Sequence, residues 1–180
     1  LGVDSLLSEE DEADDLIATL ATKMALHGQD VTIISTDKGF LSLLSPNIHI
    51  YDYFNRRYLD ENYVKNKFDI KPTQLIDLWT LTGDNTNRIP GVSGIGQITA
   101  ASLLNEHGSL SAILKSENIK LSIQEKLNVS DEQITLSRKL LTLKQNIPLG
   151  FNLKDIRLVQ TPTQQNNTLM PSEINNQQAL

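Results

Sequence analysis

A short apolar run, Val31-Thr32-Ile33-Ile34-Ser35, constrains the fold of this 180-residue chain more than any other segment. The run is rich in β-branched residues, and a continuous run of this kind is typical of a buried strand in a parallel sheet. Before it, apolar residues recur at helical spacing from Leu16 to Met24, and Gly28 ends the pattern. A helix that leads into such a strand predicts an α/β fold.

Further elements follow along the chain. The segment Ser8-Glu9-Glu10-Asp11 resembles a capping box and predicts the start of the first helix. A second strand is expected at residues 48–51, after a turn. We expect further helices over residues 60–67, 72–82, 98–106, 109–115, 120–127 and 131–144.

The end of the chain has a different composition. Polar residues dominate after about Leu158, so this segment cannot bury enough apolar surface to fold. We therefore divide the chain into an α/β part at residues 1–82, a helical part at 83–158 and a disordered polar tail at 159–180. Because the chain starts at Leu1 rather than Met, we also expect it to be a fragment of a longer protein.

Charge is distributed unevenly around a net value of −6. Residues 1–70 hold 13 acids and 6 bases, whereas residues 71–154 hold 7 acids and 9 bases. The mildly basic second half permits nucleic-acid binding without requiring it. The chain has no cysteine, which excludes disulfides and thiolate metal sites. No membrane-length apolar run or signal peptide is visible, so we expect a cytoplasmic protein.

Carboxylates gather at the start of the first helix, where Glu12, Asp14 and Asp15 lie within four residues. Acids in a first turn complement the helix dipole, which explains one or two of them. Three also match the ligands that Mg²⁺ prefers, and the residues alone leave a metal site and a solvated cap equally open. Asp37 follows the predicted strand and Asp84 opens a glycine loop. They could complete a second cluster, although each alone is better explained as an ordinary turn aspartate.

The glycine loop Gly91-Val92-Ser93-Gly94-Ile95-Gly96 leads into a predicted helix. Glycines allow a ligand to approach the backbone closely, and free N–H groups at a helix start attract anions. We therefore expect the N–H groups of residues 94–99 to face a phosphate, with the Thr99 hydroxyl as a further donor. The alternative is a tight turn without a ligand, although three glycines in six positions exceed what tightness requires.

Taken together, these strings resemble the 5′-nuclease superfamily of flap endonucleases and polymerase-associated 5′-nuclease domains, and within it the Xni (exonuclease IX-like) group. Four motifs occur in the family's order over about residues 1–158. They are Glu12-Ala13-Asp14-Asp15-Leu16-Ile17-Ala18, Ser35-Thr36-Asp37-Lys38-Gly39-Phe40, Leu81-Thr82-Gly83-Asp84 and Ile89-Pro90-Gly91-Val92-Ser93-Gly94-Ile95-Gly96.

The resemblance implies a PIN-like central parallel sheet followed by a helix–three-turn–helix element that binds duplex DNA. It implies catalytic Mg²⁺ held by Glu12, Asp14 and Asp15, with a weaker second site at Asp37 and Asp84. It further implies a K⁺ ion held by the main-chain carbonyls of Leu81, Thr82, Pro90, Val92 and Ile95. The residues implied to contact the DNA backbone are Gly94, Ile95, Gly96, Gln97, Ile98 and Thr99.

The chain departs from the polymerase-type pattern in two respects. Gly39 and Asn87 stand where that pattern has further aspartates, so we expect one firmly bound Mg²⁺ and a second bound weakly or not at all. The family's first strand, which carries another metal-binding aspartate, has no counterpart here. We therefore expect the sheet to lack strands and this chain alone to cleave DNA poorly.

The leading hypothesis is a monomeric, Mg²⁺-dependent, sequence-independent 5′-flap endonuclease. The first alternative is a catalytically weakened branched-DNA binding module, which the missing carboxylates favour and the intact Glu12-Ala13-Asp14-Asp15 string disfavours. A second alternative is a phosphohydrolase that acts on a small molecule. It leaves the helical region at 84–127 without a role.

Overall fold

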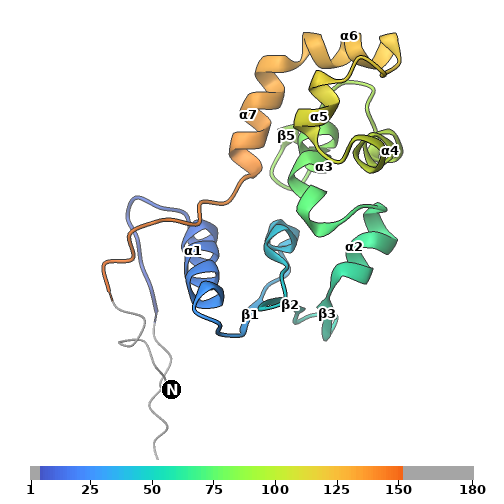
Figure 1. Cartoon of the computed structure of the whole chain (residues 1–180). Coiled ribbons are helices and arrows are strands. Elements are labelled where there is room, and N and C mark those ends of the chain that lie inside the picture. Colours follow the sequence, from blue (N-terminus) through green and yellow to red (C-terminus); the bar gives the residue numbers. More distant parts are fainter. Residues whose placement is uncertain (1–4, 152–180) are drawn as a thin grey trace, which may run out of the picture. The chain divides into compact units, whose positions relative to one another are not determined.

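The computed structural model describes residues 5–151, of which residues 7–149 form one compact unit (Figure 1). The helices are α1 (Ala13–Leu26), α2 (Glu61–Phe68), α3 (Leu75–Thr82), α4 (Gln97–His107), α5 (Leu110–Lys115), α6 (Leu121–Val129) and α7 (Asp131–Leu141), with 3₁₀ helices η1 (Lys38–Leu43) and η2 (Pro72–Gln74). The strands are β1 (Val31–Ile34), β2 (Ile48–Asp52), β3 (Arg57–Leu59), β4 (Gly83–Asp84) and β5 (Ile89–Pro90). The tail predicted at 159–180 lies outside the described residues.

The larger sheet of the described residues has the order β1-β2-β3. β1 and β2 pair in parallel, with Val31 opposite Ile48, which confirms the predicted parallel pairing. β2 and β3 are antiparallel and are joined by the turn at residues 53–56. The sheet is therefore mixed in this part of the chain, and β3 was not predicted because three residues are too few for a periodic signal.

The prediction that β1 is buried throughout was wrong. Ile33 is buried, but Thr32 is exposed and 66% of the Ile34 surface is open to solvent. α1 packs on β1, and successive side chains of a strand point to opposite faces. Alternate residues of β1 therefore face away from the helix, and a β-branched run gave no sign of this alternation.

The start of α1 lies one turn later than the capping-box prediction placed it. The Ser8 hydroxyl accepts hydrogen bonds from the N–H groups of Glu10 at 3.3 Å and Asp11 at 3.1 Å, so it closes a turn before the helix. α1 begins at Ala13, with Glu12 as an N-cap that makes no side-chain capping hydrogen bond. The first turn of α1, which holds Asp14 and Asp15, therefore has no side-chain cap.

α3 lies in the centre of the core and packs against α4 and α7 (Figure 1). Leu75, Leu78 and Leu81 are fully buried, as expected for one apolar stripe of a helix between two neighbours. The predicted helix at 72–82 is confirmed, with Pro72 in a first 3₁₀ turn and Gly83 at the C-terminal end. No helix among the described residues is long and apolar enough to cross a membrane.

α7 ends at Leu141, three residues before the predicted end at Lys144. The next residues, 143–147, leave the helix and run along α1, and we call this segment the strap. The Thr19 hydroxyl donates to the Lys144 carbonyl at 3.1 Å, and the Lys23 ammonium donates to the Ile147 carbonyl at 3.1 Å. These bonds satisfy carbonyl groups that have no partner within a helix.

Candidate functional site

The acidic start of α1 places Asp14 among other carboxylates. Partial burial, and then the charges of Asp37, Glu12 and Asp15, raise the pKa of Asp14 above its ordinary value. η1 brings Asp37 close to Asp14 although 22 residues separate them, because η1 packs against α1. Ionisation of Asp14 is therefore less favourable here than in an unfolded chain.

Asp15 has a different environment from Asp14. It is buried, and its carboxylate accepts a hydrogen bond from the Lys144 N–H at 2.8 Å. The Lys144 ammonium lies 3.5 Å from Asp15 and 3.3 Å from Asp11. The hydrogen bond with Asp11 is the main reason why the pKa of Lys144 is raised above its ordinary value.

The two aspartates of the weaker predicted site each bind a nearby backbone group. Asp37 caps η1 by accepting the Gly39 N–H at 2.7 Å. Asp84 accepts the Thr86 N–H at 2.8 Å and the Asn87 side-chain amide at 2.8 Å. Asn87 therefore supplies a neutral donor to Asp84 where a second carboxylate would add negative charge.

Among the described residues, no three acidic or histidine side chains lie close enough together to hold one metal ion. The donor chemistry of Glu12, Asp14 and Asp15 nevertheless suits a hard divalent cation, because carboxylate oxygens are ligands that Mg²⁺ prefers. Mg²⁺ commonly takes one or two protein carboxylates and completes its shell with water and phosphate oxygens.

The glycine loop brings two backbone segments into close approach. A Cβ on Gly91 would lie 2.2 Å from the Thr82 carbonyl carbon and 2.6 Å from its oxygen. A Cβ on Gly83 would lie 2.6 Å from the Gly91 nitrogen. The short β4–β5 hairpin, which the sequence prediction treated as loop, holds these segments together. Only glycine fits at either position.

Carbonyl groups of the same region already accept hydrogen bonds from the protein. The Leu81 carbonyl accepts the Val92 N–H at 2.8 Å, and the Val92 carbonyl accepts the Ile95 N–H at 3.0 Å. The Pro90 carbonyl accepts the Ser137 hydroxyl at 3.0 Å. A carbonyl oxygen has a second lone pair, so these bonds leave capacity for a cation.

The N-terminus of α4 is open to solvent. Its N-cap, Gly96, makes no side-chain capping hydrogen bond, and Gly94, Gln97 and Ile98 are exposed. The Lys126 ammonium donates to the Gly94 carbonyl at 3.1 Å and adds positive charge to the loop. The sequence did not indicate Lys126, because α6 brings it to the loop from 32 residues away. Free helix N–H groups beside an ammonium favour an anion.

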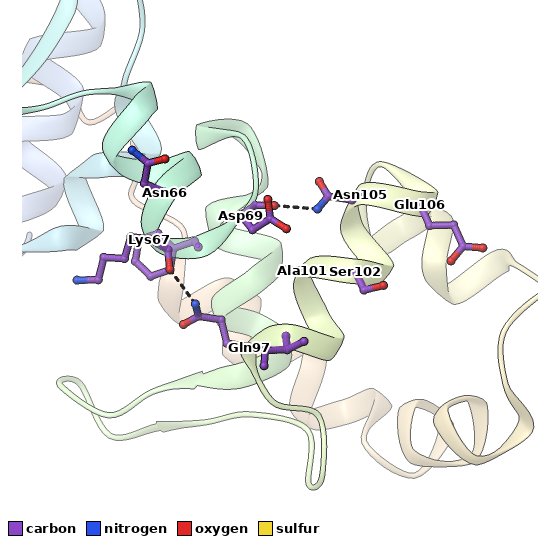
Figure 2. A pocket seen from close by; sticks show the side chains of 10 residues that line it. Asn66, Lys67, Asp69, Gln97, Ala101, Ser102, Asn105 and Glu106 are labelled. Atoms are coloured by element: carbon purple, nitrogen blue, oxygen red, sulfur yellow. Dashed lines mark hydrogen bonds between the residues drawn. The ribbon is translucent and has the colours of Figure 1, made fainter.

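A groove of about 460 Å³ separates the last turn of α2 from α4 (Figure 2). Figure 2 shows two hydrogen bonds across it: the Gln97 amide donates to the Lys67 carbonyl at 2.9 Å, and the Asn105 amide donates to the Asp69 carbonyl at 2.8 Å. These bonds hold α4 against α2. Because the Gln97 side chain is engaged in one of them, its backbone N–H is the group that could bind a ligand.

Comparison with protein families agrees with this fold. Residues 1–69 match the family described as 5′-3′ exonuclease, N-terminal resolvase-like domain. Residues 70–165 match the 5′-3′ exonuclease, C-terminal SAM fold. The chain therefore belongs to the 5′-3′ exonuclease family and combines a mixed α/β part with a helical, SAM-like part.

Curated relatives of this chain share one name, Flap endonuclease Xni. The chain is 77% identical over 157 residues to Flap endonuclease Xni of Colwellia psychrerythraea strain 34H, which covers 87% of this chain and 54% of that protein. It is 49% identical over 157 residues to Flap endonuclease Xni of Vibrio cholerae, which covers 87% of this chain and 61% of the relative. The chain spans little more than half the length of these relatives.

Solved structures of one viral nuclease share the fold. A mutant of T5 5′-exonuclease has a TM-score of 0.66 and 26% identity, over 74% of this chain and 56% of that one. The bacteriophage T5 flap endonuclease in a pseudo-enzyme-product complex with DNA and metal ions has the same TM-score and identity, over 74% of this chain and 50% of that one. Another T5 5′-exonuclease structure holds zinc.

Proposed function

We propose that this chain is the metal- and DNA-binding part of a monomeric, cytoplasmic 5′-flap endonuclease that depends on Mg²⁺. Relatives named flap endonuclease and the T5 structure with DNA and metal ions support this proposal. The main observation behind it is the group of carboxylates at the start of α1, where Glu12 makes no side-chain capping hydrogen bond and Asp14 and Asp15 lie in the first turn.

In this proposal Glu12, Asp14 and Asp15 hold Mg²⁺, and Asp37 and Asp84 form a weaker second site. Bound Mg²⁺ would supply Lewis acidity at the scissile phosphate and orient water for attack. Gly39 and Asn87 add no charge near Asp37 and Asp84, so the second site attracts cations less strongly.

The proposed DNA grip is a helix–three-turn–helix element around the α4 N-terminus. The backbone N–H groups from Gly94 to Thr99 would bind a phosphate of the duplex. A K⁺ ion on the carbonyls of Leu81, Thr82, Pro90, Val92 and Ile95 would stiffen the loop and attract the same phosphate. Contacts of this kind read no bases, so binding is independent of sequence.

The exchange Gly96→Asp tests the grip without damage to the fold. No atom lies within 4 Å of a Cβ at position 96, and the φ of −88° suits any residue. An aspartate N-cap stabilises a helix by satisfying its free N–H groups. The same carboxylate would occupy and repel the phosphate site, so affinity for a labelled 5′-flap DNA should fall about tenfold or more, as measured by fluorescence anisotropy.

The matched control is Ser111→Asp, which adds the same charge to the exposed first turn of α5. Its affinity for flap DNA should stay within about twofold of the unchanged chain, because Ser111 lies outside the proposed grip and salt weakens the interactions of exposed charges. Equal affinities for the Gly96 variant and the unchanged chain would contradict the proposed grip.

A branched-DNA binding module without catalysis is the second candidate, and Asp15 is the observation that favours it. The Asp15 carboxylate is already engaged by Lys144, and the second site has lost two acids. The two candidates differ in cleavage: a nuclease joined to its remaining segments cuts a 5′-flap when Mg²⁺ is added, and Asp14→Ala abolishes cutting while flap binding remains.

A further inference from the structure

The strap at residues 143–147 is bound to one face of α1 by charged and neutral contacts. Thr19 is fully buried, donates its hydroxyl to the Lys144 carbonyl and accepts the Ile147 N–H at 3.3 Å. The Thr22 hydroxyl donates to the Gln145 side chain at 3.2 Å. These hydrogen bonds join positions about 125 residues apart in the sequence. The position of Lys144 along α1 is therefore fixed by its backbone.

The Lys144 ammonium lies between two carboxylates of the acidic cluster. The side chain of Asp11 is 24% exposed and that of Asp15 is 12% exposed, whereas that of Lys144 is 57% exposed. A partly buried carboxylate needs a partner, and both oxygens of Asp15 have one in Lys144: the N–H for one and the ammonium for the other. Asp14, on the adjacent position of the helix, has neither.

One cluster of acids thus contains two kinds of carboxylate. Asp11 and Asp15 share one cation that belongs to the chain, whereas Asp14 makes no ion pair with the residues that the structure describes. A surface ion pair alone contributes little to stability. Here, however, the pair lies beside a site that is proposed to bind a divalent ion, where one positive charge changes affinity directly.

We propose that Lys144 is a positioning residue of the metal site, whose ammonium acts as a built-in cation that holds Asp15 and limits the affinity of the cluster for divalent ions. This inference rests on the proposed metal-binding function. Without a metal, the ammonium pairs with Asp11 and Asp15, whereas Asp14 makes no ion pair among the described residues. A divalent ion that recruits Asp15 must first displace the ammonium.

The test compares Mn²⁺ binding by the 180-residue chain and by Lys144→Met, followed by electron paramagnetic resonance of free Mn²⁺ with Mg²⁺ as competitor. Methionine keeps the apolar stem and the backbone N–H that binds Asp15. Loss of the charge should tighten Mn²⁺ binding about three- to tenfold at low salt, and less at high salt. Lys144→Gln, which can still donate to Asp15 without a charge, is the second variant if methionine disturbs the strap.

Two controls separate the possible causes. Lys144→Arg retains the charge and should bind Mn²⁺ like the unchanged chain. Lys115→Met removes the same charge from an exposed position in α5 and should also leave binding unchanged. A lysine with a merely structural role would give weaker binding when replaced.

Three results decide between the two proposals. Tighter binding in Lys144→Met or Lys144→Gln alone supports the role of Lys144. Measurable but equal or weaker binding in these variants overturns that role and leaves the metal site in place. Absence of Mn²⁺ binding in every variant overturns the metal site and the role of Lys144 together.

Discussion

The ionised Asp14 carboxylate destabilises the metal-free fold, although it belongs to the proposed metal site. Burial and the charges of Asp37 and Glu12 raise its pKa, so the folded chain holds the Asp14 proton more tightly than the unfolded chain does. Above the folded-state pKa the ionised carboxylate therefore destabilises the fold. As the pH falls through the folded-state pKa toward the unfolded-state value, this destabilisation disappears.

Replacement of this carboxylate should stabilise the metal-free chain. In EDTA at pH 7, Asp14→Asn should raise the free energy of unfolding in urea by a few tenths of a kcal/mol, since partly exposed charges are screened. The difference should vanish at a pH below the unfolded-state pKa of an aspartate, where both chains are neutral at this position. Glu10→Gln, at an exposed position outside the helix, provides the control for net charge. A less stable Asp14→Asn chain at pH 7 would contradict the account.

Contacts between residues close in the sequence could be predicted, whereas contacts between residues far apart in the sequence could not. Asp60 could be predicted as a helix cap because its partner, the Tyr63 N–H, lies three residues away. Lys144 and Lys126 could not be predicted as neighbours of Asp15 and Gly94, because tertiary packing alone brings them there. Spacing in the sequence carries no information about such contacts.

The hairpin of β4 and β5 shows the same limit for whole elements. Regular helices of eight residues or more repeat their pattern often enough to be predicted, as α3 and α4 were. Two-residue strands have no period, and the end of α7 is decided by bonds from the strap to α1. The sequence predicted close approach to the backbone in the glycine loop. It did not reveal that Gly83 and Gly91 lie against each other.

Close approach within the glycine loop leads to a prediction for Gly91→Ala. The added methyl group would overlap the Thr82 carbonyl, so the hairpin must open. We expect a loss of about 1–3 kcal/mol in the free energy of unfolding, the usual range for overpacking, together with loss of flap-DNA binding. Ser93→Ala, at an exposed position of the same loop, should change stability by less than about 0.5 kcal/mol. Comparable stability in the two variants, measured by urea unfolding, would refute the close packing.

At the scale of the whole molecule, the two halves of the chain differ in charge in a way that suits the proposed function. The acidic excess lies in residues 1–70 with the proposed metal site, and the basic excess lies in residues 71–154 with the proposed grip. A net charge of −6 therefore does not argue against DNA binding. The electrostatic part of binding should come from a few basic groups, including Lys126 beside the loop.

Salt dependence of DNA binding tests this division of charge. Two or three phosphate contacts predict that the affinity for flap DNA falls about ten- to fiftyfold between 50 and 200 mM salt. Fluorescence anisotropy titrations with flaps of two unrelated sequences should give the same slope. An affinity that does not respond to salt would favour a small-molecule phosphohydrolase instead.

The most direct measurement for the central claim is the affinity of the chain for Mn²⁺ and Mg²⁺ with and without the Asp14 carboxylate. If hard divalent ions bind at Glu12, Asp14 and Asp15, the unchanged chain binds Mn²⁺ in competition with Mg²⁺. Asp14→Asn then weakens that binding at least about tenfold, as expected when one of a few carboxylate ligands is lost. Equal binding by both chains, or no binding by either, would contradict the claim.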